Sequence, residues 1–514
     1  MKNENKLNIL MEMRPALDGY AGIPQETRLL FRGLCMIDTV KIEGLLQASH
    51  QFLASGTKTL FNVGTNQHDG SQIHRNSRVI ISIETQPATK SYNGLIRYLK
   101  KQYIAFILTF SALFLPYLRK IVITRFESRF FEDFVWRALF AKSLPPSDFS
   151  LVTNKNYRVC SIPWNVLQTA GLNSLKYVSK PAYPVLDTAN IDIFIAQTPY
   201  PGRVDKNTTL IVRYHDALPV FMPHTIAHKS RHEATHYYAL MSNVQSGAYF
   251  ACVSESTRQD LLRLFPEVQD RAVTIHNMVS HHFYTEDSDP KRIRQIIRAR
   301  TNLTVSQTSS IFKNSDDHRL DDPGLNYLLV VSTIEPRKNH SRLIAAWEHI
   351  RAEMDSDIKL VIVGGLGWDY ESIVREMRTW IEQGVLFVLS NVPADDLRVL
   401  YRHADATICP SLAEGFDYSG VETMRCGGVV IASDIAVHRE IYVDGAEYFD
   451  PYCTKSLIHS IKKVLFDLNA LELQNELRAN AKIISARYLP ENILPKWEDF
   501  LGNITKIQHN KGAL

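Results

Sequence analysis

Two glutamates eight positions apart are the residues of this chain best suited to bind a polar ligand. They bound the segment Glu414-Gly-Phe-Asp-Tyr-Ser-Gly-Val-Glu422, which leads from an apolar stretch at 406–411 into a helical one. A loop between a strand and a helix gathers backbone N–H groups and a helix N-terminus at one point, where a phosphate can be held. The carboxylates on either side can accept hydrogen bonds from sugar hydroxyls. The segment therefore predicts a site for both halves of a nucleotide-sugar.

The same segment also has a purely structural interpretation. Ser419-Gly-Val-Glu422 has the spacing of a capping box, in which a serine caps a helix and a glutamate bonds back to the cap amide. On these residues alone, an ordinary helix start and a ligand loop are both open.

Two adjacent cations follow another apolar stretch. Arg337 and Lys338 belong to Glu335-Pro-Arg-Lys-Asn339, which comes after the run at 327–333 and before a helical pattern that begins at 341. Arginine offers a fork of N–H donors and lysine a point charge, so the pair can neutralise a diphosphate. A solvated turn is the alternative. The position at a strand–helix junction, like that of Glu414, favours the ligand interpretation.

The N-terminal half offers a histidine and a glycine loop. His215 follows the stretch at 210–214 and precedes Asp216, so it could donate a hydrogen bond to a sugar or carry a proton, although a structural histidine is the alternative. Gly19 and Gly22 follow the first strand-like stretch, where glycine lets a backbone approach a ligand or simply forms a tight turn. Their spacing is not G-x-G-x-x-G, and no acidic residue follows at dinucleotide spacing, so a nicotinamide site is not predicted.

Strand and helix alternate in the C-terminal half, where these elements must position Lys338 and Glu414. Continuous apolar runs occur at 327–333, 359–365, 385–389, 406–411 and 429–433, and helical patterns lie between them at 341–354, 370–383, 393–404 and 421–426. This alternation predicts a parallel sheet with helices on both faces. Ligands bind such sheets beyond the carboxyl ends of the strands, where both residues lie.

The N-terminal half shows the same pattern more loosely. Its strand-like runs occur at 7–13, 78–84, 191–197, 210–214, 249–254 and 273–276. We predict an N-terminal domain over 1–285 with an insertion at about 95–142, a linker region at 286–323, a C-terminal domain over 324–487, and a helix within 488–514 that returns to the first domain. Asp316-Asp317 and Asp321-Asp322 in the linker are interpreted as solvated charge rather than as a metal site.

Composition limits the class of protein. A chain of 514 residues exceeds one ordinary core, and 45% hydrophobic with 22% charged residues is typical of a folded soluble protein. The net charge of +4 is small for this length and does not indicate a nucleic-acid binder. Six scattered cysteines without a CxxC pair indicate reduced thiols in a cytosolic protein. The first residues run into a strand without a signal-peptide core, so export is not expected.

One stretch departs from this soluble pattern. Residues 103–118 (YIAFILTFSALFLPYL) are almost all apolar, and they are flanked by Lys100, Lys101, Arg119 and Lys120. The run is shorter than the roughly 20 residues that a spanning helix needs. Apolar bulk with basic flanks, followed by aromatic and basic residues as far as 137, suits a segment lying in an anionic membrane surface. A buried helix of the N-terminal domain is the alternative.

With these residues assembled, the chain resembles the retaining glycosyltransferases of the GT-B fold, and in particular the bacterial mannosyl-, rhamnosyl- and glucosyltransferases of surface polysaccharide (O-antigen) assembly. The resemblance rests on Glu414-x7-Glu422 with its continuation to 433, on the loop 335–339, on His215-Asp216, and on Val253-Ser-Glu-Ser-Thr-Arg-Gln-Asp-Leu261. It implies an α/β fold of two facing Rossmann-like domains, each with a parallel sheet, and a cleft between them.

The resemblance also implies a role for each candidate residue. Glu414 would contact the donor sugar, Arg337 and Lys338 would stabilise the leaving diphosphate, His215 would lie near the reacting face of the sugar, and Glu422 would hold the ribose. The other donor-binding candidates are Gly415, Phe416, Tyr418, Ser419, Gly420 and Gly22.

Two positions depart from the pattern of these relatives. Val331-Ser332 stands where many of them have Gly-Arg, so Arg337 must compensate or the positive charge is lower. Asp417-Tyr418-Ser419 replaces Gly-Leu-Pro, which adds a negative charge near the expected phosphate site and is expected to alter sugar preference.

We therefore predict retaining transfer of a hexose from a nucleoside diphosphate sugar to a polysaccharide or lipid-linked acceptor. GDP-mannose is the first choice of donor, and UDP- and dTDP-sugars are open. No cofactor and no metal ion are expected. The expected location is the cytoplasm or the inner face of the cell membrane, contacted through 100–137. The alternatives are another GT-B enzyme, such as a phosphorylase or a nucleotide-sugar epimerase, and a non-catalytic nucleotide-sugar-binding subunit.

Overall fold

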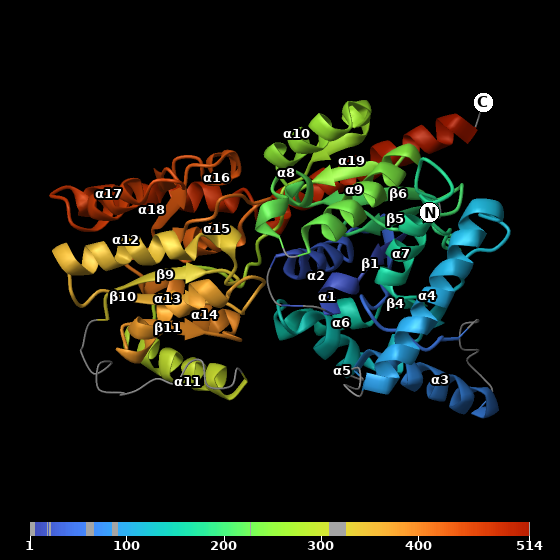
Figure 1. Cartoon of the computed structure of the whole chain (residues 1–514), viewed down its shortest axis with the longest axis horizontal. Coiled ribbons are helices and arrows are strands. Elements are labelled where there is room, and N and C mark those ends of the chain that lie inside the picture. Colours follow the sequence, from blue (N-terminus) through green and yellow to red (C-terminus); the bar gives the residue numbers. More distant parts are fainter. Residues whose placement is uncertain are drawn as a thin grey trace.

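Two sheets lie side by side along the longest axis of the molecule, the N-terminal one at the right of Figure 1 and the C-terminal one at the left. This computed structural model describes residues 6–17, 19, 22–57, 66–84, 91–226, 228–307 and 325–512. Buried apolar side chains pack on both faces of each sheet. The predicted α/β fold with two Rossmann-like domains is therefore confirmed.

The N-terminal sheet has the strand order β3-β4-β2-β1-β5-β6-β7-β8 in the described part of the chain. Its neighbours are parallel except β3 and β4. In β1, Ile9 and Met11 pack in one core cluster and Leu10 in another, because successive side chains of a strand point to opposite faces. The strands are β1 (Leu7–Glu12), β2 (Val40–Leu46), β3 (Ile123–Phe126), β4 (Asn156–Cys160), β5 (Ile193–Ala196), β6 (Thr209–Tyr214), β7 (Tyr249–Cys252) and β8 (Ala272–Thr274).

The C-terminal sheet is parallel throughout its described strands, in the order β11-β10-β9-β12-β13-β14. All five strands predicted in this half are present, and β14 is an addition. The strands are β9 (Tyr327–Val331), β10 (Lys359–Val363), β11 (Leu386–Leu389), β12 (Ala406–Cys409), β13 (Val430–Ser433) and β14 (Ala446–Phe449).

Helices follow most strands of both sheets. In the N-terminal part they are α1 (Arg14–Leu17), α2 (Ile23–Leu34), α3 (Asn66–Glu84), α4 (Ser91–Phe114), α5 (Glu132–Val135), α6 (Phe149–Thr153), α7 (Trp164–Ser174), α8 (Leu218–Phe221), α9 (Lys229–Gln245) and α10 (Glu255–Leu264). In the C-terminal part they are α12 (His340–Glu353), α13 (Glu371–Glu382), α14 (Ala394–His403), α15 (Tyr418–Arg425), α16 (Ala436–Tyr442), α17 (Thr454–Leu465) and α18 (Ala470–Ala486).

The strand predicted at 78–84 is wrong, because this stretch is the end of helix α3. Its β-branched residues resemble a strand, but Asn76 and Val79 are the buried positions, and Ile83 is half-buried. Buried positions three or four residues apart lie on one face of a helix. The sequence prediction also missed β2, β3 and β4. Of these, β2 pairs with β1, β4 pairs with β2, and β3 pairs with β4.

The region predicted as a linker contains a helix that packs on the C-terminal sheet. Helix α11 (Lys291–Gln307) contacts β11 and α14, and Ile293 and Ile297 are buried. Arg300 forms an ion pair with Asp396 at 2.8 Å. Figure 1 shows α11 below that sheet. The two aspartate pairs at 316–317 and 321–322 lie outside the described residues, and the domain limits stay a prediction.

The last helix connects the two domains. Helix α19 (Pro490–Gly512) leaves the C-terminal domain and runs along the N-terminal one, where the chain ends (Figure 1). Its Trp497 is fully buried beneath the guanidinium of Arg213, and the ring of Phe500 meets that of Tyr249. The helix predicted within 488–514 is thus present. All six cysteines are free thiols.

Candidate active site

Charged residues from two loops meet at the carboxyl edge of the C-terminal sheet. Glu414 follows β12, and Arg337 and Lys338 follow the neighbouring parallel strand β9. Arg337 Nη1 donates to Glu414 Oε2 at 2.7 Å, and Lys338 Nζ donates to Glu414 Oε1. Residues 77 positions apart in the chain therefore form one cluster, because parallel neighbours end at the same edge of a sheet.

A turn holds the two loops together. Asn339 has a left-handed backbone with φ 57°, a conformation that asparagine tolerates better than most residues. Its side-chain amide donates to the carbonyls of Pro410 and Pro451, at 3.1 and 3.0 Å. The backbone N–H of Leu412 donates to the carbonyl of Arg337 at 2.9 Å. The cations are thus held against Glu414 by the backbone as well as by charge.

The electrostatics of the cluster favour the ionised form of Glu414. Burial opposes ionisation, but Arg337 and Lys338 outweigh it and hold the pKa of the carboxyl below its usual value. Arg337 also contacts Glu335, whose pKa burial raises. The side chains of Arg337 and Lys338 keep 14% and 13% of their surface exposed, so a ligand anion can compete with the carboxylates for both cations.

The N-terminal domain reaches this cluster at His215. A Cβ on Gly415 would lie 1.9 Å from the carbonyl oxygen of His215, so only glycine allows the two loops to approach. The His215 side chain is buried, and burial together with Arg213 holds its pKa well below the usual value, which leaves the imidazole neutral. Its Nε2 has no hydrogen-bond partner. Burial raises the pKa of the adjacent Asp216, whose charge interacts with Arg337 and Glu414.

Gln197 is a candidate that the sequence prediction missed. It follows β5, as His215 follows the neighbouring parallel strand β6, so both lie at the carboxyl edge of the N-terminal sheet. Gln197 is fully buried, and neither its side-chain oxygen nor its side-chain nitrogen has a hydrogen-bond partner. Its backbone contacts the ring of His215, and its N–H donates to Glu12 at 2.9 Å. Buried polar groups are nearly always paired, so the unpaired atoms on Gln197 and His215 mark a place where a polar ligand can bind. A polar residue directly after a buried strand was the available signal.

Glu422 lies in a different setting from Glu414. It is buried between the domains, where it accepts from Gln25 Nε2 at 2.7 Å and from the Tyr401 hydroxyl at 3.0 Å. Burial raises the pKa of its carboxyl to about 7, against the effect of these two bonds. The carboxylate predicted to hold the ribose is thus hydrogen-bonded to a side-chain amide of the N-terminal domain.

The affinity of the chain for a nucleotide-sugar is expected to rise by about tenfold between pH 6 and pH 8. In its predicted role Glu422 accepts hydrogen bonds from the ribose hydroxyls, which requires the ionised carboxylate, and below its pKa of about 7 a proton must first be lost. The diphosphate of a nucleotide-sugar does not titrate in this range, so calorimetry at both pH values isolates the protein group. Glu422→Gln should bind more weakly and show no such pH dependence. If the affinity of Glu422→Gln rose with pH as steeply as that of the wild type, the pH dependence would come from a group other than Glu422.

The start of α15 is capped by Asp417 rather than by Ser419. Asp417 has φ 63°, and its carboxylate accepts from the Ser419 N–H at 3.2 Å and the Ser419 hydroxyl at 2.7 Å. His438, also bonded to that carboxylate, outweighs burial and lowers the pKa of Asp417. The capping-box alternative is therefore wrong, since Glu422 bonds to Gln25 and Tyr401 instead. The helix N-terminus predicted for a phosphate already has an anionic partner.

Tyr418 joins the two domains through a buried network. Its hydroxyl donates to Glu26 Oε2 at 2.8 Å, and Glu26 forms an ion pair with the fully buried Arg213 at 2.9 Å. Phe416 is buried beside Tyr418, with ring centroids 5.3 Å apart, and makes a second ring contact with Tyr488. These two donor-binding candidates thus pack the domain interface, and their contact with a donor stays a prediction.

At two of the predicted site positions, Gly420 and Gly22, the local structure favours glycine over any other residue. A Cβ on Gly420 would lie 2.3 Å from the ring of Tyr442, so this position admits no side chain. Gly22 precedes α2 with φ 70°, a conformation that favours glycine, and open space surrounds it. The ligand roles of Gly22, Ser419 and Gly420 stay predictions.

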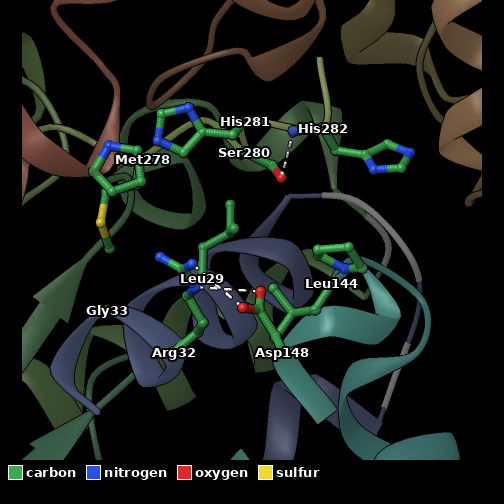
Figure 2. A pocket seen from close by; sticks show the side chains of 11 residues that line it. Leu29, Arg32, Gly33, Leu144, Asp148, Met278, Ser280, His281 and His282 are labelled. Carbon is green, nitrogen blue, oxygen red and sulfur yellow. Dashed lines mark hydrogen bonds and ion pairs between the residues drawn. The ribbon is translucent and has the colours of Figure 1, made fainter. Parts of the chain in front are cut away.

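A small cavity of about 50 Å³ lies away from these residues. Figure 2 shows it between α2, which contributes Leu29 and Arg32, and the backbone around Met278 and His282. Arg32 forms an ion pair with Asp148 at its wall, 3.2 Å apart. None of the predicted site residues lines it.

The C-terminal half has recognisable relatives. Residues 312–483 match the family of glycosyl transferases group 1. The serotype-specific mannosyltransferase WbdA of Escherichia coli is 25% identical over 276 residues, which cover 53% of this chain and 31% of that protein. The O-antigen chain mannosyltransferase RfbU of Salmonella typhimurium is 29% identical over 225 residues, which cover 39% of this chain and 62% of that protein. The match spans less than two-thirds of the length of either relative.

Solved structures share the fold over nearly the whole chain. Sucrose-phosphate synthase from Thermosynechococcus elongatus has a TM-score of 0.56 at 12% identity and covers 98% of this chain and 100% of its own. Anabaena Alr3699/HepE, in complex with UDP and glucose, has a TM-score of 0.52 at 14% identity and covers 97% and 100%. The GT-B architecture predicted from the sequence is thereby confirmed.

Proposed function

We propose that this chain, whose C-terminal half matches the glycosyl transferases of group 1, transfers a hexose with retention from a nucleoside diphosphate sugar to a glycan acceptor. One observation carries the proposal. Arg337, Lys338 and Glu414 converge at the carboxyl edge of β9 and β12, and His215 of the other domain meets them at Gly415. Two cations beside a sugar-binding carboxylate, facing a second domain, suit an activated sugar bound between the domains.

The proposed chemistry depends on fixed positive charge. As the sugar–phosphate bond breaks, negative charge develops on the departing diphosphate, and Arg337 and Lys338 take it up without a metal ion. Glu414 holds both cations in place before the donor arrives and accepts hydrogen bonds from the sugar. The acceptor hydroxyl attacks from the side of the leaving group, and a phosphate oxygen takes its proton, so no nucleophile of the protein is needed.

The donor we propose is GDP-mannose, on the basis of the mannosyltransferases among the relatives. A neighbour in fold was solved with UDP and glucose, which keeps UDP-sugars as the second choice. The acceptor we propose is a growing polysaccharide or a lipid-linked glycan of the kind that carries an O-antigen. Such an acceptor would place the enzyme in the cytoplasm, at the inner face of the cell membrane.

Donor turnover tests this proposal directly. The purified chain is incubated with GDP-mannose, UDP-glucose or dTDP-rhamnose, with and without a chelator, and release of nucleoside diphosphate is measured. We expect release from one donor, at an unchanged rate with chelator. When a mannoside acceptor is supplied, the product should have by NMR the same anomeric configuration as that donor. Binding of a nucleotide in a thermal-shift screen without release from any donor would favour a non-catalytic subunit and refute the proposal.

A further inference from the structure

Helix α4 turns large apolar side chains toward the solvent. Tyr103, Phe106, Phe110 and Phe114 are 66%, 60%, 51% and 66% exposed. Their spacing of three and four residues places them on one face of the helix. Soluble monomers rarely expose so continuous an apolar surface unless it binds something.

The stripe extends beyond these four residues at both ends. Leu95 and Leu99 continue it toward the helix start, and Leu118 and Val122 continue it in the loop that follows. Leu118 is 87% exposed. Figure 1 shows α4 along the outer edge of the N-terminal domain, on the side away from the C-terminal domain.

The opposite face of α4 is the one that packs on the protein. Ala105, Thr109 and Ala112 are buried there against α7, and the Thr109 hydroxyl donates to the carbonyl of Ala170 at 3.0 Å. An ordinary surface helix does the reverse, with its large apolar residues on the core. The interpretation of 103–118 as a buried helix is therefore wrong for its aromatic face. Of the helices described, none is both long and apolar enough to span a membrane.

Only cations accompany this surface in the sequence. No aspartate or glutamate occurs between Glu84 and Glu127, whereas seven lysines and arginines do. The net charge of the whole chain is +4, so the rest of it is negative. Lys100 and Arg119, one near each end of the aromatic stripe, are exposed. Positive charge is thus concentrated beside the apolar face, which complements an anionic surface.

We propose that the aromatic face of α4 together with 115–122, here called the α4 surface, docks on an anionic lipid bilayer. The helix lies in the plane of the membrane, with its rings at the boundary of headgroups and acyl chains and its basic residues on the headgroups. The contact ends near Val122, because β3 belongs to the sheet and Phe134 and Val135 are buried. It is thus narrower than the 100–137 expected from the sequence. This inference goes beyond the proposed function and does not depend on it.

Vesicle flotation with the full chain tests the docking. The vesicles contain either phosphatidylcholine alone or phosphatidylcholine with phosphatidylglycerol. We expect the wild type to float with the anionic vesicles only. In the triple variant Phe106→Ser, Phe110→Ser, Phe114→Ser, the fraction of protein bound to anionic vesicles should fall at least tenfold. The double variant Lys100→Glu, Arg119→Glu should show a fall of the same size. The matched control is Tyr452→Ser with Leu471→Ser, which removes exposed apolar residues of the C-terminal domain and should bind as the wild type does.

Three results would overturn the docking proposal. The first is a wild type that floats with neither kind of vesicle. The second is an aromatic variant that floats as well as the wild type. The third is a wild-type dimer in sedimentation velocity that the aromatic variant dissociates, with no vesicle binding, since a second copy would then cover the face. Donor turnover on a soluble acceptor separates the two proposals, because a chain that floats without turnover refutes only the proposed function.

Discussion

Lys338→Ala is expected to lower the rate of donor turnover by about 10²–10³-fold, the usual effect of removing one preorganised group that stabilises developing charge. The Lys338 side chain is 13% exposed and its ammonium is held against Glu414, so it is in position before the donor arrives. Its removal leaves Arg337 as the remaining cation of this loop for the departing diphosphate. The measurement is kcat for nucleoside diphosphate release, with the melting temperature recorded for the same sample.

Lys462→Ala is the matched control for this experiment. Lys462 also pairs with a glutamate of the same domain, Glu353, but on the exposed surface far along the chain from the site. Its loss should leave kcat and the melting temperature nearly unchanged, since exposed ion pairs contribute little. Glu414→Ala should resemble Lys338→Ala in kcat. Near-normal turnover in both site variants, with the fold intact, would remove the charge cluster from the mechanism.

Arg213→Met is expected to lower the free energy of unfolding by about 3–5 kcal/mol, because it leaves a buried carboxylate without its charge partner. Arg213 is fully buried and donates to Glu26, to Asn277 Oδ1 at 2.7 Å and to the carbonyl of Ile275 at 2.6 Å. Glu26 in turn accepts from Tyr418 across the domain interface. The effect should appear as an earlier urea transition of the N-terminal domain, followed by circular dichroism.

Two further variants separate burial from charge pairing. Arg439→Met also breaks an arginine–carboxylate pair, but one on the surface: the side chains of Arg439 and Asp434 are 52% and 46% exposed. It should cost less than about 1 kcal/mol. Adding Glu26→Leu to Arg213→Met should restore part of the lost stability, because no unpaired charge is then left. Equal losses from Arg213→Met and Arg439→Met would show that the buried network does not stabilise the fold.

Sequence reasoning worked best where a local pattern decides the local structure. The strands of the C-terminal sheet are continuous apolar runs, and a parallel sheet buried on both faces needs such runs. The stretch at 78–84 failed because a short β-branched run fits a strand or a helix, and only its contacts decide between them. Gln197 was missed because a polar residue after a buried strand is a weak signal, and only the tertiary structure shows that its amide has no partner.

The sequence by itself determined the two α/β domains, because strands and helices follow from local periodicity. It also determined the edge at which Lys338 and Glu414 lie, because the loops that follow parallel strands meet at the carboxyl edge of the sheet. Tertiary structure decided what each polar group contacts. Only the packing of two domains could place Gln25 on Glu422, Tyr418 on Glu26 and the backbone of His215 against Gly415. It also decided that α4 buries its small residues and exposes its aromatic ones, because the hydrophobic pattern of a helix shows its faces but not which of them finds a partner.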